Sequence, residues 1–172
     1  PGRVFFRLRG LARLPLNGEH MLKTRVSTKE DVPALVDIWR RSVLATHHFL
    51  SEADFREIEE IVSVKYLPHA EVWVAAGGDG RPLGFMGLSQ DHVDALFIDP
   101  DVRGQGIGTM LLAHAESICG PLTVDVNEQN EQAVGFYRRM GFVDTGRSAL
   151  DGDGRPYPLL HMRRPPKQDG LA

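Results

Sequence analysis

The chain has 172 residues, of which 42% are hydrophobic and 25% charged, a length and composition that suit one globular domain. Its net charge of −3 and its pI of about 6.2 argue against a nucleic-acid-binding protein, which would have a basic surface. It has no apolar run of about 18 residues for a membrane helix and no C-x-x-C or H-E-x-x-H motif, so neither a membrane nor a metal partner is expected. The one cysteine, Cys119, excludes an intrachain disulfide and fits a reducing cytoplasm, the expected location.

Residues 1–20 differ in composition from the rest of the chain. They contain four arginines and a single acid, Glu19, and they lack the uninterrupted apolar region of a signal peptide. We interpret residues 1–20 as a leader or tag-like N-terminal extension, with an organellar transit segment or an extra native element as alternatives. The main domain is expected over residues 21–164, followed by a loose tail at 165–172.

The first predicted elements are a strand over residues 22–26 and an amphipathic helix. Ser27 and Thr28 precede Glu30 and Asp31, which is the spacing of a capping box at a helix N-terminus. Apolar residues then recur at helical spacing, at Val32, Leu35, Val36, Trp39 and Val43. This periodicity predicts a helix with one face in the core.

A break between helices is predicted over residues 45–50. Ser51 and Asp54 then begin a second helix, which ends at Leu67-Pro68. Apolar runs separated by turn residues predict the strands that follow, over residues 71–76, 83–89 and 93–98.

The second half alternates between strands and helices. A glycine-rich turn after Asp99-Pro100 leads into a helix that ends at Gly120-Pro121. The remaining elements are a strand at 122–126, a polar loop at 127–130, a helix through Met140 with Gly141 after its end, and strands at 142–147 and 159–162. This order predicts an α/β (α+β) fold: a mixed, mostly antiparallel sheet with one parallel pair formed by a right-handed crossover, and helices on both faces.

The glycine-rich turn predicts a phosphate-binding site, because a helix N-terminus offers free backbone N–H groups and a favourable dipole. A P-loop requires a lysine that the sequence Gly106-Ile107-Gly108-Thr109 lacks. A dinucleotide fingerprint requires a glycine where Thr109 stands, although Asp125 lies about 20 residues further on, as that motif expects. The third pattern is Arg103-x-x-Gly106-x-Gly108.

A second motif combines Asn130, Ala133, Tyr137 and Gly141-Phe142. Together with the arginine–glycine pattern, and in this order, it resembles the acetyl-CoA signature of the GNAT superfamily of N-acetyltransferases over residues 21–164. The segments 45–50, 94–104 and 127–137 look more narrowly like the small bacterial YjaB-type acetyltransferases, a subgroup assigned to peptidyl-lysine. The resemblance implies the GNAT fold, with a splayed parallel strand pair, and acetyl-CoA as co-substrate.

The resemblance also implies the residues that contact acetyl-CoA. Main-chain groups of one strand are expected to pair with the pantetheine, and the turn is expected to hold the pyrophosphate. The predicted contacts are Leu96, Phe97, Ile98, Arg103, Gly104, Gln105, Gly106, Ile107, Gly108, Thr109, Asn127, Asn130, Phe136 and Tyr137. The glycines also fit a simple tight turn, Arg103 a surface position, and each asparagine a helix cap.

Tyr137 is the predicted general acid, because a phenol with a pKa near 10 can protonate a leaving thiolate; the alternative is an aromatic residue that only fills the core. Asp94 and His92 are the predicted general base. Alternation along a strand places both on the side of Leu96 and Ile98, although a strand end facing water would explain them equally well. His47, His48 and Phe49 are predicted at the acceptor site, with the two histidines as rival bases.

The expected function is transfer of acetyl from acetyl-CoA to a primary amine, with protein lysine as the leading acceptor. Cys119 is expected at the far end of its helix, so a covalent intermediate is not expected and direct transfer in a ternary complex is preferred. One alternative is acetylation of an amino acid, polyamine or antibiotic, and another is a non-catalytic acyl-CoA sensor. The chain is expected to be a monomer or homodimer.

Overall fold

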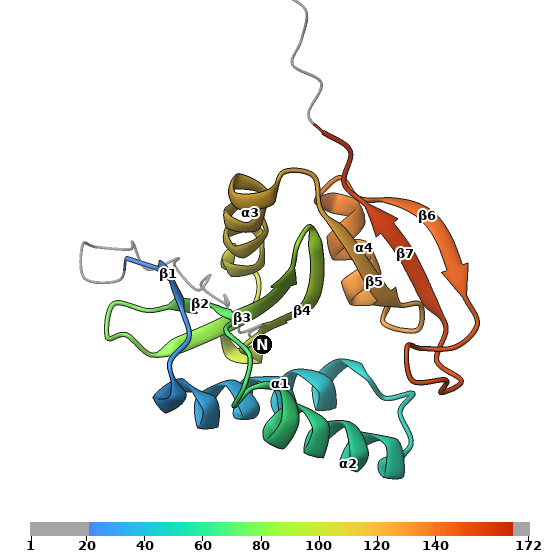
Figure 1. Ribbon diagram of the computed structural model, residues 1–172, viewed down its shortest axis with the longest axis horizontal. Coiled ribbons are helices and arrows are strands. Elements are labelled where there is room, and N and C mark those ends of the chain that lie inside the picture. Colours follow the sequence, from blue (N-terminus) through green and yellow to red (C-terminus); the bar gives the residue numbers. More distant parts are fainter. Residues whose placement is uncertain (1–20, 167–172) are drawn as a thin grey trace, which may run out of the picture.

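A computed structural model describes residues 21–166 as one seven-stranded sheet with helices packed on it (Figure 1). The leader predicted at 1–20 and most of the tail predicted at 165–172 lie outside the described residues. The strands are β1 (Lys23–Val26), β2 (Trp73–Ala76), β3 (Pro82–Ser89), β4 (His92–Ile98), β5 (Thr123–Asn127), β6 (Val143–Ser148) and β7 (Leu159–Arg163). The α-helices are α1 (Val32–Thr46), α2 (Glu52–Glu60), α3 (Ile107–Cys119) and α4 (Glu131–Arg139), with short 3₁₀ or π turns at Lys29–Asp31, Ile61–Tyr66 and Pro100–Val102.

The sheet has the order β1-β2-β3-β4-β5-β7-β6, and every described neighbouring pair is antiparallel except β4 and β5. These two parallel strands pair only at His92 with Thr123 and at Val93 with Val124. Beyond these pairs the strands separate, and Figure 1 shows the two halves of the sheet opening away from each other. The predicted mixed sheet with a splayed parallel pair is confirmed, and the opening forms a fork in the middle of the sheet.

Helices cover both faces of the sheet, as predicted. On one face, α1 and α2 bury a cluster in which Leu35 and Trp39 pack with Val74 and Phe85. On the other face, α3 and α4 bury a second cluster, which contains Ala75, Met86, Leu111, Val124 and Val134. Neighbouring residues of a strand, such as Val74 and Ala75, belong to different clusters because successive side chains point to opposite faces.

A β-bulge in β4 changes the face to which several residues point. Gly87 of β3 pairs with Ala95, and the next residue, Leu88, pairs with Val93, so Asp94 has no partner in this ladder. The extra residue shifts the alternation: Val93 packs on the α3 face together with Leu96 and Ile98. The prediction that Asp94 and His92 share a side with Leu96 and Ile98 is therefore wrong, because it assumed an unbroken alternation.

The local signals at the helix ends are mostly confirmed. The backbone N–H of Thr28 donates to the Asp31 carboxylate at 2.8 Å, and Ser51 caps α2 by accepting from the N–H of Asp54 at 3.1 Å. The first helix, however, continues to Thr46, two residues into the predicted break. Glycine follows the end of α4 at Gly141, with φ of 88°, as expected for a helix C-terminus.

An ion pair that sequence patterns did not indicate ties α1 to the end of β4. The two terminal guanidinium nitrogens of Arg41 donate to the carboxylate of Asp99, at 2.9 and 2.8 Å. Asp99 is buried, and its carboxylate also accepts the N–H of Asp101 at 3.0 Å. The hydrogen bonds from Arg41 hold the pKa of Asp99 below its usual value. The pair therefore fixes the point where β4 ends and the glycine-rich turn begins.

Arg41→Ala is expected to lower the free energy of unfolding by about 2 kcal/mol, because a buried carboxylate loses two charge-assisted hydrogen bonds and keeps only the more distant cation of Arg81, 3.8 Å away. The matched variant is Arg40→Ala, whose partner is Glu59 on an exposed part of the surface; it should cost less than about 1 kcal/mol. Because folding lowers the pKa of Asp99, the ionised carboxylate contributes fully to the free energy of unfolding above about pH 4. This contribution is lost as the pH falls below that value. Urea unfolding at pH 7 and pH 3 measures both effects, and equal losses for the two variants at pH 7 would contradict the assignment.

Candidate active site

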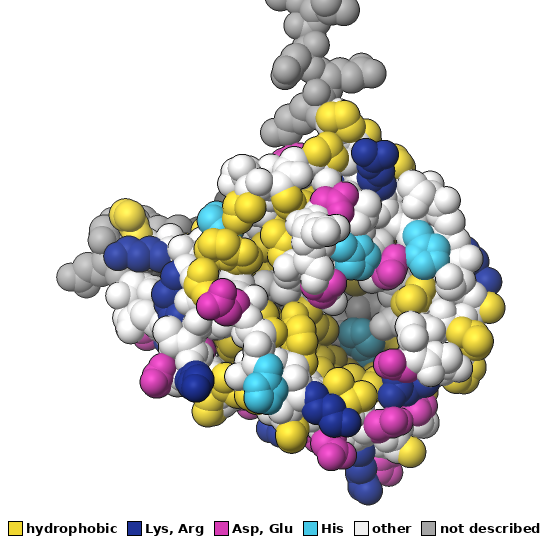
Figure 2. Space-filling view, viewed as in Figure 1, with side chains coloured by type: hydrophobic (Ala, Val, Ile, Leu, Met, Phe, Trp, Pro, Cys, Tyr) yellow, Lys and Arg dark blue, Asp and Glu magenta, His cyan; other side chains and the backbone are white. Residues whose placement is uncertain are grey.

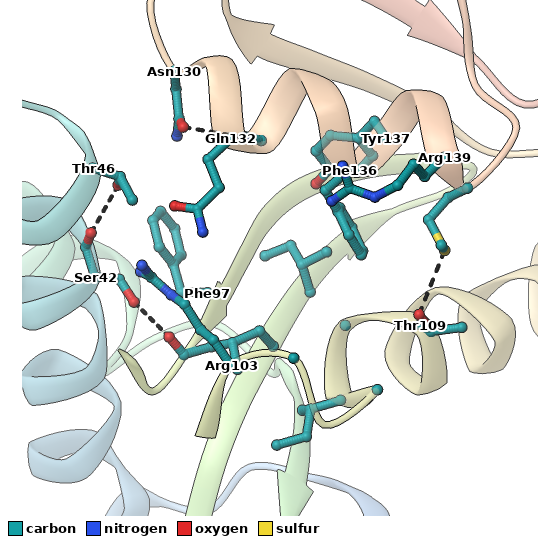
Figure 3. Close-up of a pocket in the computed structure, with 18 of the residues that line it drawn as sticks. Ser42, Thr46, Phe97, Arg103, Thr109, Asn130, Gln132, Phe136, Tyr137 and Arg139 are labelled. Carbon is teal, nitrogen blue, oxygen red and sulfur yellow. Dashed lines mark hydrogen bonds between the residues drawn. The ribbon is translucent and has the colours of Figure 1, made fainter. Parts of the chain in front are cut away.

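A cavity of about 500 Å³ occupies the fork between β4 and β5. Figure 2 shows the molecule hollowed between its two halves, with histidine, acidic and apolar side chains around the hollow. Its walls come from the C-terminal end of α1, the second half of β4, the glycine-rich turn with the start of α3, and one side of α4 (Figure 3). The lining residues include Leu96, Phe97, Ile98, Arg103, Gly104, Gly106, Ile107, Gly108, Thr109, Asn130, Phe136 and Tyr137. Most of the residues predicted to contact acetyl-CoA therefore meet in one cavity.

The glycine-rich turn has the backbone geometry of an anion-binding site. Gly104 and Gly106 have φ values of 76° and 82°, which L-residues with side chains rarely adopt, and a Cβ atom at either position would meet nothing within 4 Å. The first hydrogen bond within α3 runs from the N–H of Met110 to the carbonyl of Gly106, so the N–H groups before it have no helical partner. The turn can thus present several N–H donors to an anion at the positive end of the helix dipole.

Gly108 has a different role from the other two glycines. It lies inside α3, and a Cβ there would approach the ring of Phe136 to 3.0 Å. The absence of a side chain lets the start of α3 pack closely against α4. Two walls of the cavity therefore pack together at Gly108. The sequence pattern had indicated a phosphate contact or a tight turn at this glycine, not a packing role.

Two arginines line the cavity from opposite sides. Figure 3 shows the guanidinium of Arg103 extended from the turn toward α1 and Phe97, and Arg139 on α4 near Tyr137. Arg139 was not predicted, because its position in α4 gives no sign of which neighbour it faces. The preceding residue, Arg138, donates to Asp144 at 2.8 Å instead and does not line the cavity. The two arginines give the cavity positive charge on both sides of the glycine-rich turn.

Tyr137 lies on the α4 wall and is only 6% exposed. Its ring packs edge to face against Phe136 and Phe142, each at a centroid distance of 5.2 Å. Figure 3 shows the residue beside the cavity. Burial raises its pKa above the usual value of a phenol, so the group stays protonated at neutral pH. The two interpretations of the sequence are compatible, since the ring fills the core while the residue also lines the cavity.

Of the predicted contacts with amide side chains, Asn130 lines the cavity, whereas Asn127 and Gln105 do not. The side chain of Asn130 lines the cavity and caps α4 by accepting from the N–H of Ala133 at 3.1 Å. Asn127 pairs with Leu159 in the sheet, and Gln105 is exposed on the turn; neither lines the cavity. For Gln105, a contact through its backbone N–H remains compatible with this position.

Neither of the two predicted bases lines the cavity. His92 lies at the first of the two positions at which β4 pairs with β5, one pair before the strands separate. Its Nδ1 is 3.0 Å from Thr123 Oγ1 and its Nε2 is 3.8 Å from the Asp125 carboxylate. Asp94, on the bulge, accepts a hydrogen bond from the hydroxyl of Ser89. The pKa of Tyr66 is raised to about 12, mainly by burial and to a smaller extent by the negative charge of Asp94. Asp94 is therefore exposed and bonded to an exposed hydroxyl, whereas His92 is half-buried beside Asp125.

Of the three residues predicted at the acceptor site, only His47 lines the cavity. Burial lowers its pKa to about 4, with smaller contributions from the positive charge of Arg103 and from His48. His48 is exposed and borders a neighbouring depression beside α2. Phe49 packs against the His47 ring at 5.2 Å and so supports the wall without lining it.

The remaining lining residues come from α1, from the 3₁₀ turn after β4 and from α4 with the residue after it, and they were not predicted from the sequence. They are Ser42, Thr46, Val102, Gln132, Ala133, Arg139 and Met140. Ser42 and Thr46 lie four residues apart, on the same side of a helix, and this polar pair within an apolar stripe is the signal that could have identified them.

Cys119 is at the C-terminal end of α3, away from the turn, and its thiol donates to the carbonyl of Ala115 at 3.1 Å. Across residues 21–166, no three His, Cys, Asp or Glu side chains are grouped so that they could hold a metal ion. No helix in the same part of the chain is long and apolar enough to cross a membrane.

Comparisons with known proteins agree with this arrangement. Residues 68–144 match the model of an acetyltransferase (GNAT) domain. The chain is 57% identical to the peptidyl-lysine N-acetyltransferase YjaB of Salmonella typhimurium strain LT2, over 84% of this chain and 99% of that protein. It is 54% identical to YjaB of Escherichia coli strain K12, over 83% and 96% of the two chains.

The solution structure of the apo form of E. coli YjaB superposes with a TM-score of 0.80 and 53% identity, over 84% of this chain and 97% of that one. Similarity at this level extends over the fork, the glycine-rich turn and α4. The chain therefore belongs to the GNAT family of acetyl-CoA-dependent N-acetyltransferases.

Proposed function

We propose that this enzyme transfers acetyl from acetyl-CoA directly to the side-chain amine of protein lysine. The observation that carries the proposal is the cavity in the fork, which has an anion-binding turn on one wall, the phenol of Tyr137 on another and His47 on a third. The two relatives that it resembles along most of their length are named for peptidyl-lysine acetylation, which supports lysine as the acceptor.

In this proposal the glycine-rich turn binds the pyrophosphate of acetyl-CoA. The free N–H groups around Gly104, Gly106 and the start of α3 supply hydrogen-bond donors, and Arg103 and Arg139 supply positive charge. The exposed main-chain groups of β4 beyond its last pair with β5 are available to the pantetheine amides. The thioester is thereby held across the fork, next to Tyr137.

In the transfer the lysine ammonium loses one proton to a base before attack and a second proton as the amide forms, and the leaving thiolate gains one. We assign the proton that the thiolate gains to the hydroxyl of Tyr137, because burial keeps this phenol protonated; the phenolate regains a proton from the nitrogen as the amide forms. For the proton of the ammonium group we favour His92 over Asp94. His92 lies one pair before the fork opens, with its Nε2 3.8 Å from the Asp125 carboxylate, whereas Asp94 is hydrogen bonded to Ser89. Holding both substrates in line removes much of the entropic cost of their encounter.

The test is release of free CoA thiol from acetyl-CoA in the presence of a panel of amines: a lysine-containing protein, a lysine peptide, free lysine, a polyamine and an aminoglycoside. The expected result is the highest kcat/KM for lysine within a polypeptide, with the acetyl group found on Nζ by mass spectrometry. A preference of more than tenfold for a small amine would support the small-molecule alternative. Binding of acetyl-CoA without thiol release for any amine would support the acyl-CoA sensor.

Arg139→Ala is expected to raise the Kd for acetyl-CoA by about tenfold, which corresponds to the loss of one charge-assisted contact with phosphate. The control is Arg138→Ala, which removes an equal charge from the adjacent residue but not from the cavity. It should change the Kd less than twofold. Calorimetry at low and high salt measures the Kd of both variants, and the difference between the two Kd values should shrink at high salt. An equal loss of acetyl-CoA affinity in both variants would indicate a general effect of charge.

A further inference from the structure

His47 is the one histidine of the described chain that lines the cavity, and its protonation can be deduced from its neighbours. This inference rests on the proposed function, since it concerns how the acceptor amine is held. His47 follows directly after α1 and lines the cavity. Figure 3 shows Ser42 and Thr46 of the same helix on the wall opposite α4. It is a neutral imidazole at neutral pH, because its pKa is lowered to about 4.

A neutral imidazole carries its proton on one nitrogen, and the hydrogen bonds around Thr46 decide which one. The hydroxyl of Thr46 lies 2.8 Å from the carbonyl oxygen of Ser42, which can only accept, so the hydroxyl proton is used there. The same Thr46 oxygen lies 2.8 Å from His47 Nδ1. With its proton donated to the carbonyl, this oxygen is left to accept from Nδ1–H. The arrangement favours the tautomer that has its proton on Nδ1 and a lone pair on Nε2.

The chain of hydrogen bonds continues to the strand that borders the fork. Ser42 is 3% exposed, and its own hydroxyl donates to the carbonyl of Ile98 at 2.7 Å. His47, Thr46 and Ser42 are thus linked in sequence to the end of β4. Ser42 therefore ties the end of α1 that carries His47 to the strand that is proposed to hold the thioester.

The plane of the ring is supported from its other side. Phe49 packs against His47 at a centroid distance of 5.2 Å and against Tyr157 at 5.8 Å. Tyr157 is 7% exposed; its oxygen accepts the N–H of Ser51 at 3.1 Å and its hydroxyl donates to Asp54. The loop between β6 and β7 is thereby joined to the start of α2, and the aromatic stack holds the imidazole at the cavity wall.

We propose that His47 Nε2 accepts a hydrogen bond from the attacking amine of the acceptor, and that Thr46 is a positioning residue that keeps this nitrogen unprotonated. Within the described residues Nε2 has no hydrogen-bond partner, and the cavity that it lines is where the amine must meet the thioester. A hydrogen bond to Nε2 orients one N–H of the amine, which directs the nitrogen lone pair toward the acetyl carbonyl. His47 does not take up the proton of the ammonium group.

The tautomer can be measured without any substrate. Two-bond ¹H–¹⁵N correlation spectra of the free protein at pH 7 are expected to show a protonated Nδ1 and an unprotonated Nε2 for His47. In Thr46→Val, which replaces the hydroxyl with a methyl group of similar size, nothing holds the proton on Nδ1. The Nε2 resonance should then move toward the position of a protonated nitrogen. A wild-type His47 with its proton on Nε2 would overturn the inference.

Kinetics test the contact with the amine. His47→Phe keeps an aromatic ring against Phe49 but removes the lone pair, and kcat/KM for the acceptor should fall about tenfold, the effect of one lost hydrogen bond. Thr46→Val should cause a smaller loss in the same direction. The KM for acetyl-CoA should stay within twofold for both variants. The matched control is His69→Gln, an exposed histidine outside the cavity, which should leave all these constants unchanged.

The two proposals fail in different ways. Full acceptor kcat/KM in a folded His47→Phe variant would overturn the role of His47 and leave lysine acetylation intact. Absence of acetyl transfer by the wild-type protein would overturn the proposed function, and the role of His47 with it, whatever its tautomer. If His47→Phe does not fold, the spectra and the Thr46→Val kinetics still test the proposed roles of His47 and Thr46. An unchanged His47 tautomer in Thr46→Val would contradict the role of Thr46.

Discussion

Replacing Tyr137 with phenylalanine is expected to lower kcat at least tenfold, toward the ~10²–10⁴-fold that a positioned general acid contributes. The ring is buried between Phe136 and Phe142, and phenylalanine retains that packing, so the fold and the Kd for acetyl-CoA should change little. The thiolate would then have to be protonated by water. Steady-state kinetics and calorimetric titration with acetyl-CoA separate the loss of turnover from any loss of binding.

The control for this prediction is Tyr66→Phe. Tyr66 also has a raised pKa because of its burial, about 12, but it does not line the cavity, so kcat should be retained. The pKa of Tyr137 lies above that of an ordinary phenol, so this hydroxyl stays protonated. Deprotonation of Tyr137 should therefore not lower the wild-type kcat up to roughly pH 9. A Tyr137→Phe variant with full turnover would exclude the phenol as the acid.

Replacing Gly106 with valine is expected to reduce acetyl-CoA binding below the limit of calorimetric detection. At φ of 82° a β-branched residue is strained, and relief of that strain would move the N–H groups that are proposed to meet the pyrophosphate. A side chain there would also occupy the open space that the ligand needs. Several hydrogen bonds to an anion are lost together, which makes this effect larger than that of removing one arginine.

Gly80→Val separates the effect on the site from the effect of backbone strain. Gly80 has the same φ, 82°, and the same open surroundings, but it lies in the turn between β2 and β3, away from the cavity. The two variants should lose similar amounts of stability in thermal unfolding, while Gly80→Val should bind acetyl-CoA as tightly as the wild type. Normal binding by Gly106→Val would remove the glycine-rich turn from the proposed site.

The local features of this fold could be predicted because they depend on short sequence spacings. The capping box at Thr28 and Asp31, the glycine after α4 and the alternation of strands with amphipathic helices follow from the residues within one or two turns of chain. The two motifs around Gly106 and Tyr137 identified the family for the same reason. Each motif has fixed spacings that can be found in the sequence without the structure.

The register of the sheet could not be predicted in this way. Asp94 and His92 were placed on the side of Leu96 by counting alternate residues, and the bulge at Asp94 changes that count. Whether a strand contains an extra residue is decided by its partner, here β3, which gives no local signal in β4. The choice between His92 and Asp94 as base therefore depended on the tertiary structure.

The sequence by itself determined the fold class, the glycine-rich turn and the presence of a phenol at Tyr137, since each depends on residues close together in the chain. Only the tertiary structure brought α1 to the fork, buried Asp99 against Arg41, and placed Arg139 rather than Arg138 at the cavity. It also placed His47 in the same cavity as the glycine-rich turn and Tyr137. These features depend on which surfaces meet when distant segments pack, and no spacing within one segment specifies that.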